Sequence, residues 1–336
     1  NHLSDQLRRN IRDLVIARNR LHSILDGLHE GVVALEADNA VVYHNQAAYQ
    51  LLNVCEEAEL LRVLAPVLPL CDKARAGEGP QALTMDVGES KLLMVVSQSQ
   101  ETSEVAPGTV IVVQDVTAAE RLEQTRRDYV ANVSHELRTP IASIRSLAET
   151  LNDGLVKTED DRSRYYGYIL RESMRLSRLI NDLLELSRLQ SGAVALEKQP
   201  FALDGVVDEV VEQMVLVASY SGIRVNTRWN CPRPLTVRSN RDRIEQVLIA
   251  LLDNAIKFAL DESVIVLETR LNKTEKCAVI SVKNTGHISE EHLPHLFERF
   301  YKADTSHSDG GTGLGLAIVH EILSHLGETI EAKNEE

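Results

Sequence analysis

The strongest constraint on the fold is a pair of long amphipathic segments within residues 118–191. In both segments apolar side chains recur at steps of three, four or seven residues. This spacing places them on one face of an α-helix. The first segment contributes Val130, Val133, Leu137, Ile141, Ile144, Ala148 and Leu151, and the second contributes Ile169, Leu176, Leu179, Leu183 and Leu186. Gly154 lies between the segments, so we predict an antiparallel helical hairpin.

A hairpin of this kind cannot bury both apolar stripes by itself. Two copies would bury them together in a four-helix bundle, so we expect a homodimer. Thr158 to Asp161 has the composition of an N-terminal cap for the second helix. The sequence therefore predicts where the second arm begins as well as what it packs against.

The regions on either side of the hairpin have different patterns. Residues 1–21 are polar with a narrow apolar stripe that includes Leu3 and Leu7, and this stripe favours a coiled-coil seam over a short surface helix. Residues 22–117 combine helical stretches with short β-type runs at 31–35, 40–44, 91–97 and 109–114, with a turn at Asp38-Asn39. Residues 200–336 alternate the two patterns, with helices expected at 206–218 and 241–259 and strands at 223–229, 263–271 and 277–283.

The composition excludes several classes of function. The chain of 336 residues has 36 Lys plus Arg against 50 Asp plus Glu, giving a net charge of −14. A chain this acidic is unsuited to general binding of nucleic acid or anionic lipid, because both need a basic face. The 4 cysteines are scattered without ligand-like spacing, which argues against structural zinc and a disulfide framework. Apolar runs reach only about six residues, too short for a membrane-spanning helix.

His135 is the first candidate for chemistry. Glu136 is its neighbour and Thr139 lies one helical turn further on. A neutral imidazole is a competent nucleophile near neutral pH, and a carboxylate can take its proton. A His–Glu pair alone would more often be an ordinary surface feature. Pro140 removes one backbone donor and is expected to bend the helix.

The full run of residues 132–140, NVSHELRTP, resembles the phosphoacceptor box of sensor histidine kinases. The resemblance implies that His135 accepts the γ-phosphoryl group of ATP and that Glu136 serves as the base. It also implies that Thr139 helps to orient water when the same domain dephosphorylates its partner. These three residues are the predicted catalytic set.

A second candidate is residues 251–258, LLDNAIKF, where Asn254, Lys257 and Phe258 share one helical face. They offer an amide oxygen for a metal, an ammonium for phosphate and a ring for a base. The run resembles the asparagine box of the same kinases and of gyrase-type ATPases, which implies Mg²⁺ at Asn254 and ATP beside it. The family usually has a further asparagine where this chain has Ala250.

The next two candidates follow this helix in the chain. In residues 282–286, VKNTG, the family usually has an Asp that bonds adenine; Asn284 keeps an acceptor oxygen, and Gly286 follows it. Residues 296–302, LFERFYK, resemble the phenylalanine box, which anchors the lid over ATP. Lys302 stands where the family often has a basic residue near the terminal phosphate.

The last candidate is the glycine-rich run of residues 310–318, GGTGLGLAI. Glycines let the backbone approach phosphate, and the helix that follows favours anions at its N-terminus. The run lacks the Lys-Ser/Thr of a Walker loop and the spacing of a dinucleotide fingerprint. It resembles the second glycine box of histidine kinases, with Gly311, Gly313 and Gly315 as candidate ATP contacts. The lid at 301–310 looks short, and the C-terminus looks one strand short of the family's fold.

The five boxes occur in family order, and the remaining segments fit around them. Residues 24–52 and the exit at 114–117, QDVT, resemble a PAS sensor domain, and residues 1–7 resemble the end of a HAMP linker. We therefore expect a multidomain α+β protein. Its parts are a signalling helix at 1–21, a PAS-like sensor at 22–117, a dimeric phosphotransfer hairpin at 118–195 and an α/β-sandwich ATP-binding domain at 196–336.

The resemblance implies a sensor histidine kinase that phosphorylates His135 and passes the group to an aspartate of a response regulator, with phosphatase activity toward that regulator. The chain begins with Asn1, so we expect a fragment of a longer protein. The resemblance of residues 1–7 to a HAMP linker implies that this fragment is the cytoplasmic part of a protein anchored in the inner or plasma membrane. Two alternatives stay open. One is a weak kinase that acts mainly as a phosphatase or scaffold, and the other is a dimeric adaptor without ATP chemistry.

Overall fold

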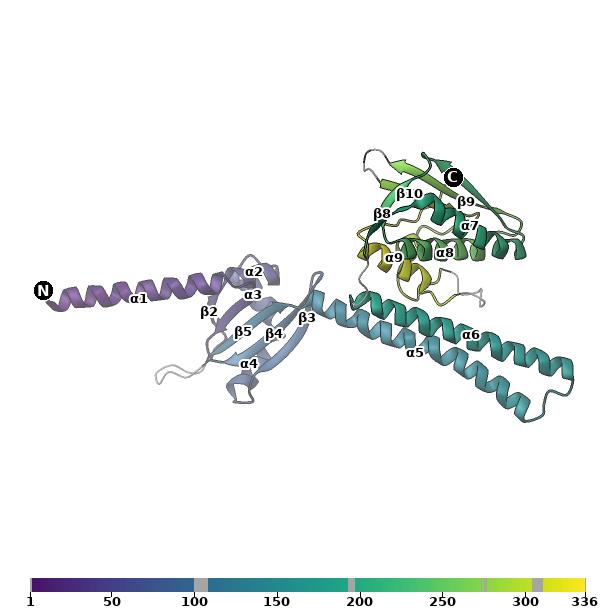
Figure 1. The fold of residues 1–336 in the computed structure, drawn as a ribbon. Helices are drawn as coiled ribbons and strands as arrows, with labels where there is room; N and C mark the ends of the chain where they lie inside the picture. Colours follow the sequence, from purple (N-terminus) through teal and green to yellow (C-terminus); the bar gives the residue numbers. More distant parts are fainter. Residues whose placement is uncertain are drawn as a thin grey trace. The chain divides into compact units, whose positions relative to one another are not determined.

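The computed structural model describes residues 2–99, 108–192, 197–272, 274, 277–303 and 311–335. The chain divides into two compact units, Asn1–Asp128 and Tyr129–Glu336. Figure 1 follows the chain through both units. Among the helices of the described residues, none is long and apolar enough to cross a membrane.

The first unit begins with the long helix α1 (His2–Asp26) and contains a five-stranded sheet in the order β2-β1-β5-β4-β3. The strands are β1 (Gly31–Leu35), β2 (Val41–His44), β3 (Gln81–Val87), β4 (Ser90–Gln98) and β5 (Thr109–Asp115), and every neighbouring pair is antiparallel. The predicted strands match four of these, and Asn39 has the positive φ of 69° that the turn at Asp38-Asn39 requires. Leu3 and Leu7 of the expected seam have side chains outside the described set.

Three short helices complete this unit between β2 and β3: α2 (Gln46–Leu52), α3 (Glu57–Leu64) and α4 (Leu68–Arg75). Side chains at every second position of β1, β4 and β5 are buried, and they share one core with residues of the three helices. Cys71 belongs to this core, where burial raises the pKa of its thiol. The sheet therefore buries one face under helices, as its alternating pattern requires.

The fully buried Asn45 joins three elements of the first unit. Its side-chain oxygen accepts hydrogen bonds from the backbone N–H of Val32 at 2.8 Å and of Ala48 at 3.0 Å, which caps α2. Its amide nitrogen donates to the carbonyls of Leu25 and Glu30, each at 2.9 Å. Every bonding group of a buried amide is thus satisfied, and the last turn of α1 is tied to β1 and α2.

The second unit contains the predicted hairpin, formed by α5 (Thr117–Asn152), most of which lies in this unit, and α6 (Glu159–Gln190). The Thr158 side chain accepts a hydrogen bond from the backbone N–H of Asp161 and caps α6, as predicted. Helix α5 continues through Pro140, whose ring is buried. The prediction that this proline bends the helix stays a prediction.

The rest of the second unit is a sandwich of strands and helices. A three-stranded sheet has the order β10-β9-β7, with β7 parallel to β9 and β9 antiparallel to β10, and a two-stranded sheet pairs β6 with β8. The strands are β6 (Gln199–Ala202), β7 (Arg224–Asn230), β8 (Thr236–Ser239), β9 (Val264–Asn272) and β10 (Cys277–Lys283). The helices are α7 (Leu203–Tyr220), α8 (Arg241–Phe258), the 3-10 turn η1 (Leu293–His295) and α9 (Gly315–His325).

The hairpin and the sandwich share one hydrophobic core. Buried leucines of α6 belong to the same cluster as side chains of α7, α8, β9 and α9. The α6 members are Leu179, Leu186 and Leu189. The apolar stripe of the second arm therefore meets the sandwich over part of its length, and this contact positions the candidate site.

Candidate functional site

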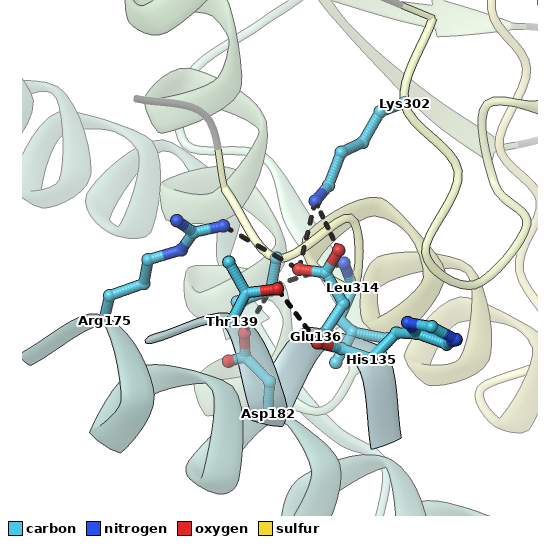
Figure 2. A network of polar contacts seen from close by, with 8 residues as sticks. His135, Glu136, Thr139, Arg175, Asp182, Lys302 and Leu314 are labelled. Atoms are coloured by element: carbon cyan, nitrogen blue, oxygen red, sulfur yellow. Dashed lines mark hydrogen bonds and ion pairs between the residues drawn. The ribbon is translucent and has the colours of Figure 1, made fainter. Parts of the chain in front are cut away.

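His135 lies on α5 with its side chain exposed. Within the described part of the chain, its imidazole makes no hydrogen bond or ion pair. The hydroxyl of Thr139, one turn on, donates to the His135 carbonyl oxygen at 3.2 Å (Figure 2). The structure thus brings Thr139 to the His135 backbone and leaves the imidazole accessible to a reactant.

Glu136 points to a different side of α5 from His135 and meets two cations. The Lys302 ammonium donates to its two carboxylate oxygens at 3.0 Å and 3.1 Å, and an Arg175 guanidinium nitrogen lies 3.8 Å away (Figure 2). The Glu136 side chain is 27% exposed, so water screens these charges incompletely. The predicted base is therefore held by a residue of the phenylalanine box and by a residue of α6.

A second polar contact joins α6 to the glycine-rich segment. The Thr312 hydroxyl donates to an Asp182 carboxylate oxygen at 2.9 Å, and it accepts the backbone N–H of Leu314 at 3.3 Å. Burial raises the pKa of Asp182, the hydrogen bond from Thr312 lowers it, and the charge of Glu185 raises it. Further along α6, Glu185 accepts from Arg243 at 2.6 Å and from Gln246 at 2.7 Å. The hairpin therefore contacts the sandwich through two neighbouring residues of α6, Asp182 and Glu185.

The glycines of the last box differ in what they do. A Cβ added to Gly311 would lie 3.2 Å from the Lys257 ammonium, so this cation lies directly against the loop. Gly313 has a φ of +71°, and a Cβ there would lie 2.8 Å from the Phe300 carbonyl carbon. Gly315 begins α9, and a Cβ there would meet open space. Gly313 is therefore required by its backbone conformation, whereas a Cβ at Gly311 would meet only the end of a flexible lysine side chain.

Lys257 and Phe258 end α8, with the ammonium 4.9 Å from the ring centroid. Burial lowers the pKa of Lys257; the Asp253 charge raises it, and the charges of Lys302, Arg178 and Arg175 lower it. A cation that is disfavoured by burial and by like charges gains free energy when an anion binds beside it. The Phe258 side chain is exposed beside this cation and is free to contact a ligand.

Asn254 lies one turn before Phe258 on α8 and is half-buried. Within the described residues its amide makes no hydrogen bond, so its oxygen is available to a cation. Mg²⁺ takes few protein oxygens when phosphates and waters supply the rest of its shell. The donor set of this position therefore fits Mg²⁺ held together with a polyphosphate.

Asn284 and Gly286 follow β10 and lie beside the end of α8. The Asn284 amide nitrogen donates to the Thr285 carbonyl at 3.3 Å. Gly286 has a φ of 149°, and a Cβ there would lie 3.6 Å from the Phe258 carbonyl oxygen. Residues of the predicted adenine contact and of the asparagine box are thus neighbours in space. The expected lid residues 304–310, and Gly310 with them, lie outside the described residues.

The sequence reasoning missed the contribution of α6. Arg175, Arg178, Asp182 and Glu185 recur at steps of three and four residues, beside the apolar stripe. Such a polar stripe is usually a solvated face, yet here three of its members contact Glu136, Thr312 and Arg243. The regular spacing of charged residues next to a buried stripe was the signal available.

Comparisons with known proteins agree with this organisation. Residues 125–192 match the His Kinase A (phospho-acceptor) domain, residues 239–336 match the histidine kinase-, DNA gyrase B- and HSP90-like ATPase, and residues 19–83 match the PAS domain. The sensor protein SrrB of Staphylococcus aureus (strain NCTC 8325 / PS 47) is 29% identical over 343 residues, which cover 100% of this chain and 57% of SrrB. The chain thus spans little more than half of the curated relatives it matches.

Among solved structures, the histidine kinase ThkA in complex with the response regulator protein TrrA is similar to this chain. The likeness has 25% sequence identity and a TM-score of 0.52, and it covers 94% of each chain. The fold is therefore similar along nearly the whole length of both chains.

Proposed function

We propose, on the premise that this chain belongs to the sensor histidine kinase family, that it transfers the terminal phosphoryl group of ATP to His135. The group then passes to an aspartate of a response regulator. The observation that carries the proposal is the pair of contacts between the hairpin and the sandwich. Lys302 reaches the residue next to His135, and Thr312 of the glycine loop reaches Asp182.

The residues suggest how the transfer proceeds. A ring nitrogen of His135 attacks the terminal phosphorus, the bond to the bridging oxygen breaks, and ADP leaves. The ring proton passes to Glu136, which first has to be released from Lys302. Positive charge at Lys257 and Lys302 stabilises the charge that develops on the phosphoryl oxygens. Asn254 would hold Mg²⁺, which supplies further charge neutralisation when bound.

Two partners follow from this proposal. The exposed apolar side chains of the hairpin, such as Ile141, Leu170 and Leu184, favour a homodimer through a four-helix bundle. The second partner is a response regulator receiver domain; the relative ThkA was solved with a protein of that class. We further propose that the parent protein is membrane-anchored through a HAMP linker before residue 22, and that Thr139 supports phosphatase activity toward the regulator.

The test is incubation with γ-labelled ATP and Mg²⁺, followed by acid and alkali treatment of the protein. Phosphohistidine is labile in acid and stable in alkali, so the label should be lost in acid alone. A label with the opposite profile would place the phosphoryl group on a different residue type and contradict the proposal.

A second candidate is a nucleotide-binding protein with weak kinase output that acts mainly as a phosphatase or scaffold. Ala250, half-buried on α8 against the core, favours it, because the family's asparagine at this position is missing. ATP binding without formation of phosphohistidine would favour this candidate. Absence of ATP binding would favour an adaptor.

A further inference from the structure

We propose that Lys302 is shared between Glu136 and the terminal phosphate of ATP, so that nucleotide binding itself releases the base. This inference rests on the proposed function, because it concerns how the same site is regulated. Three observations support it: the ion pair between Lys302 and Glu136, the direction in which the Glu136 carboxylate points, and the cations close to the glycine loop.

The ion pair is well formed and joins distant parts of the chain. Lys302 donates to both Glu136 oxygens at 3.0 Å and 3.1 Å across 166 residues of sequence. The two side chains are 30% and 27% exposed, so both are partly withdrawn from water. A charge-assisted contact in this setting is stronger than one between fully exposed side chains.

The pair holds Glu136 away from His135. Successive side chains on an α-helix point about 100° apart around its axis. Figure 2 shows the Glu136 carboxylate directed to Lys302 and Arg175, with the His135 ring pointing elsewhere. While Lys302 contacts both oxygens, the Glu136 carboxylate is directed away from the imidazole. In this arrangement the phosphoacceptor lacks its base.

The surroundings of Lys302 show what competes for it. Lys257 lies against Gly311, and it experiences the positive charges of Lys302, Arg178 and Arg175. The nearby acidic groups are Glu136, Asp253 and Asp182. A triphosphate in the glycine loop would bring several negative charges to this cluster, against one on the Glu136 carboxylate. The terminal phosphate is therefore the stronger partner for Lys302.

Arg175 provides a counter-charge for Glu136 after Lys302 has moved to the phosphate. Once Lys302 turns to phosphate, a half-buried carboxylate would otherwise lack a counter-charge, which is unfavourable. The Arg175 guanidinium lies 3.8 Å from Glu136 and comes from α6, not from the lid side. It remains in place while Lys302 moves. Glu136 then keeps one distant cation and has a free oxygen for the His135 proton.

The experiment measures nucleotide binding, not activity, with AMP-PNP and ADP as probes. If Glu136 competes for Lys302, Glu136→Gln removes the competitor and should tighten AMP-PNP binding about fivefold. ADP lacks the terminal phosphate, so its affinity should change less than about twofold. In a Lys302→Met background, Glu136→Gln should no longer change AMP-PNP affinity, whereas a Lys302→Arg background should retain the effect.

Glu185→Gln is the matched control, because it weakens a different ion pair between the hairpin and the sandwich, that of Glu185 on α6 with Arg243 on α8. It should affect AMP-PNP and ADP equally, whatever residue is at 302. Unchanged AMP-PNP affinity in Glu136→Gln, an equal gain for ADP, or a gain that persists with Lys302→Met would each overturn the proposal. Absence of binding of either nucleotide to the unaltered protein would instead refute the proposed function, so the two failures are distinguishable.

Discussion

The backbone N–H of Phe300 donates a hydrogen bond to the Gly313 carbonyl oxygen at 2.9 Å. Both residues have a positive φ, 63° for Phe300 and 71° for Gly313. This hydrogen bond connects the phenylalanine box to the glycine box. The glycine loop is therefore held in shape by a strained, tightly packed backbone.

Gly313→Ala should disrupt this connection. The added Cβ would lie 2.8 Å from the Phe300 carbonyl carbon and 2.9 Å from its Cα, neither of which is a flexible side-chain end. The positive φ adds strain, so we expect a loss of about 1–3 kcal/mol in stability and at least about tenfold weaker ATP binding. Nucleotide titration and urea unfolding measure the two effects.

Gly205→Ala is the control for that substitution. Gly205 lies in α7 with open space around its Cβ position, so alanine should stabilise the helix by about 0.5–1 kcal/mol. ATP affinity should not change. If Gly313→Ala behaved like Gly205→Ala, the Phe300–Gly313 contact would have no role in shaping the site.

Asn254→Asp should weaken the use of Mg²⁺–ATP. The substitution keeps the size of the side chain but adds a negative charge where the triphosphate is expected, and it removes the neutral amide. We expect at least about a tenfold fall in phosphorylation rate at limiting Mg²⁺–ATP, which a magnesium titration measures. Asp242→Asn, with a side chain 90% exposed in the first turn of α8, provides the comparison. Equal phosphorylation rates for the two variants would show that Asn254 is not part of the Mg²⁺–ATP site.

Lys257 should make nucleotide binding depend on alkaline pH. Burial first, and the neighbouring cations after it, hold its pKa below the ordinary lysine value of 10.5. The charge that attracts phosphate is present below this lowered pKa and is lost as pH rises through it. AMP-PNP affinity should therefore fall at a pH below the usual range of lysine.

In the unliganded protein, the same residue should make the folding stability increase with pH, opposite to the fall in AMP-PNP affinity. The unfolded chain holds the Lys257 proton more tightly, so this residue's contribution to folding stability rises as pH rises through the lowered pKa. Lys257→Arg should flatten both trends, because the guanidinium stays charged. A pH profile of AMP-PNP affinity that is identical in the unaltered protein and in Lys257→Arg would contradict this account.

Asn45→Ala should destabilise the first unit. Four hydrogen bonds connect this fully buried side chain to Leu25, Glu30, Val32 and Ala48. Truncation leaves several buried backbone groups unpaired, which costs about 2–4 kcal/mol. Thermal unfolding of the chain measures the loss. Gln46→Ala, at an exposed position of α2, should cost less than about 0.5 kcal/mol; an equal loss in both variants would assign the effect to α2 propensity.

Local patterns of sequence predicted the elements that local physics determines. The two arms of the hairpin and the cap at Thr158 follow from apolar spacing and from a side chain that bonds the backbone three residues on. The strands β9 and β10 followed from two β-type runs that are close together in the sequence. The candidate site residues could be identified from the sequence because each of them belongs to a short, continuous motif.

Contacts between distant segments were not readable in the same way. Lys302 with Glu136 spans 166 residues, and Thr312 with Asp182 spans 130. The local sequence around each residue does not predict its distant partner. The charged stripe of α6 has the same pattern as a solvent-exposed helix face. The sequence placed Glu136 beside His135 as its base, whereas the structure pairs its carboxylate with Lys302 and Arg175, which come from distant segments of the chain.

The measurement that tests the central claim most directly compares the unaltered protein with His135→Gln after incubation with γ-labelled ATP and Mg²⁺. The account predicts an acid-labile, alkali-stable label on the unaltered protein and no label on the variant. AMP-PNP should bind both proteins equally, since His135 lies on the hairpin and not in the nucleotide-binding sandwich. Label of the same chemical stability on the variant would contradict the assignment of His135 as the phosphoacceptor.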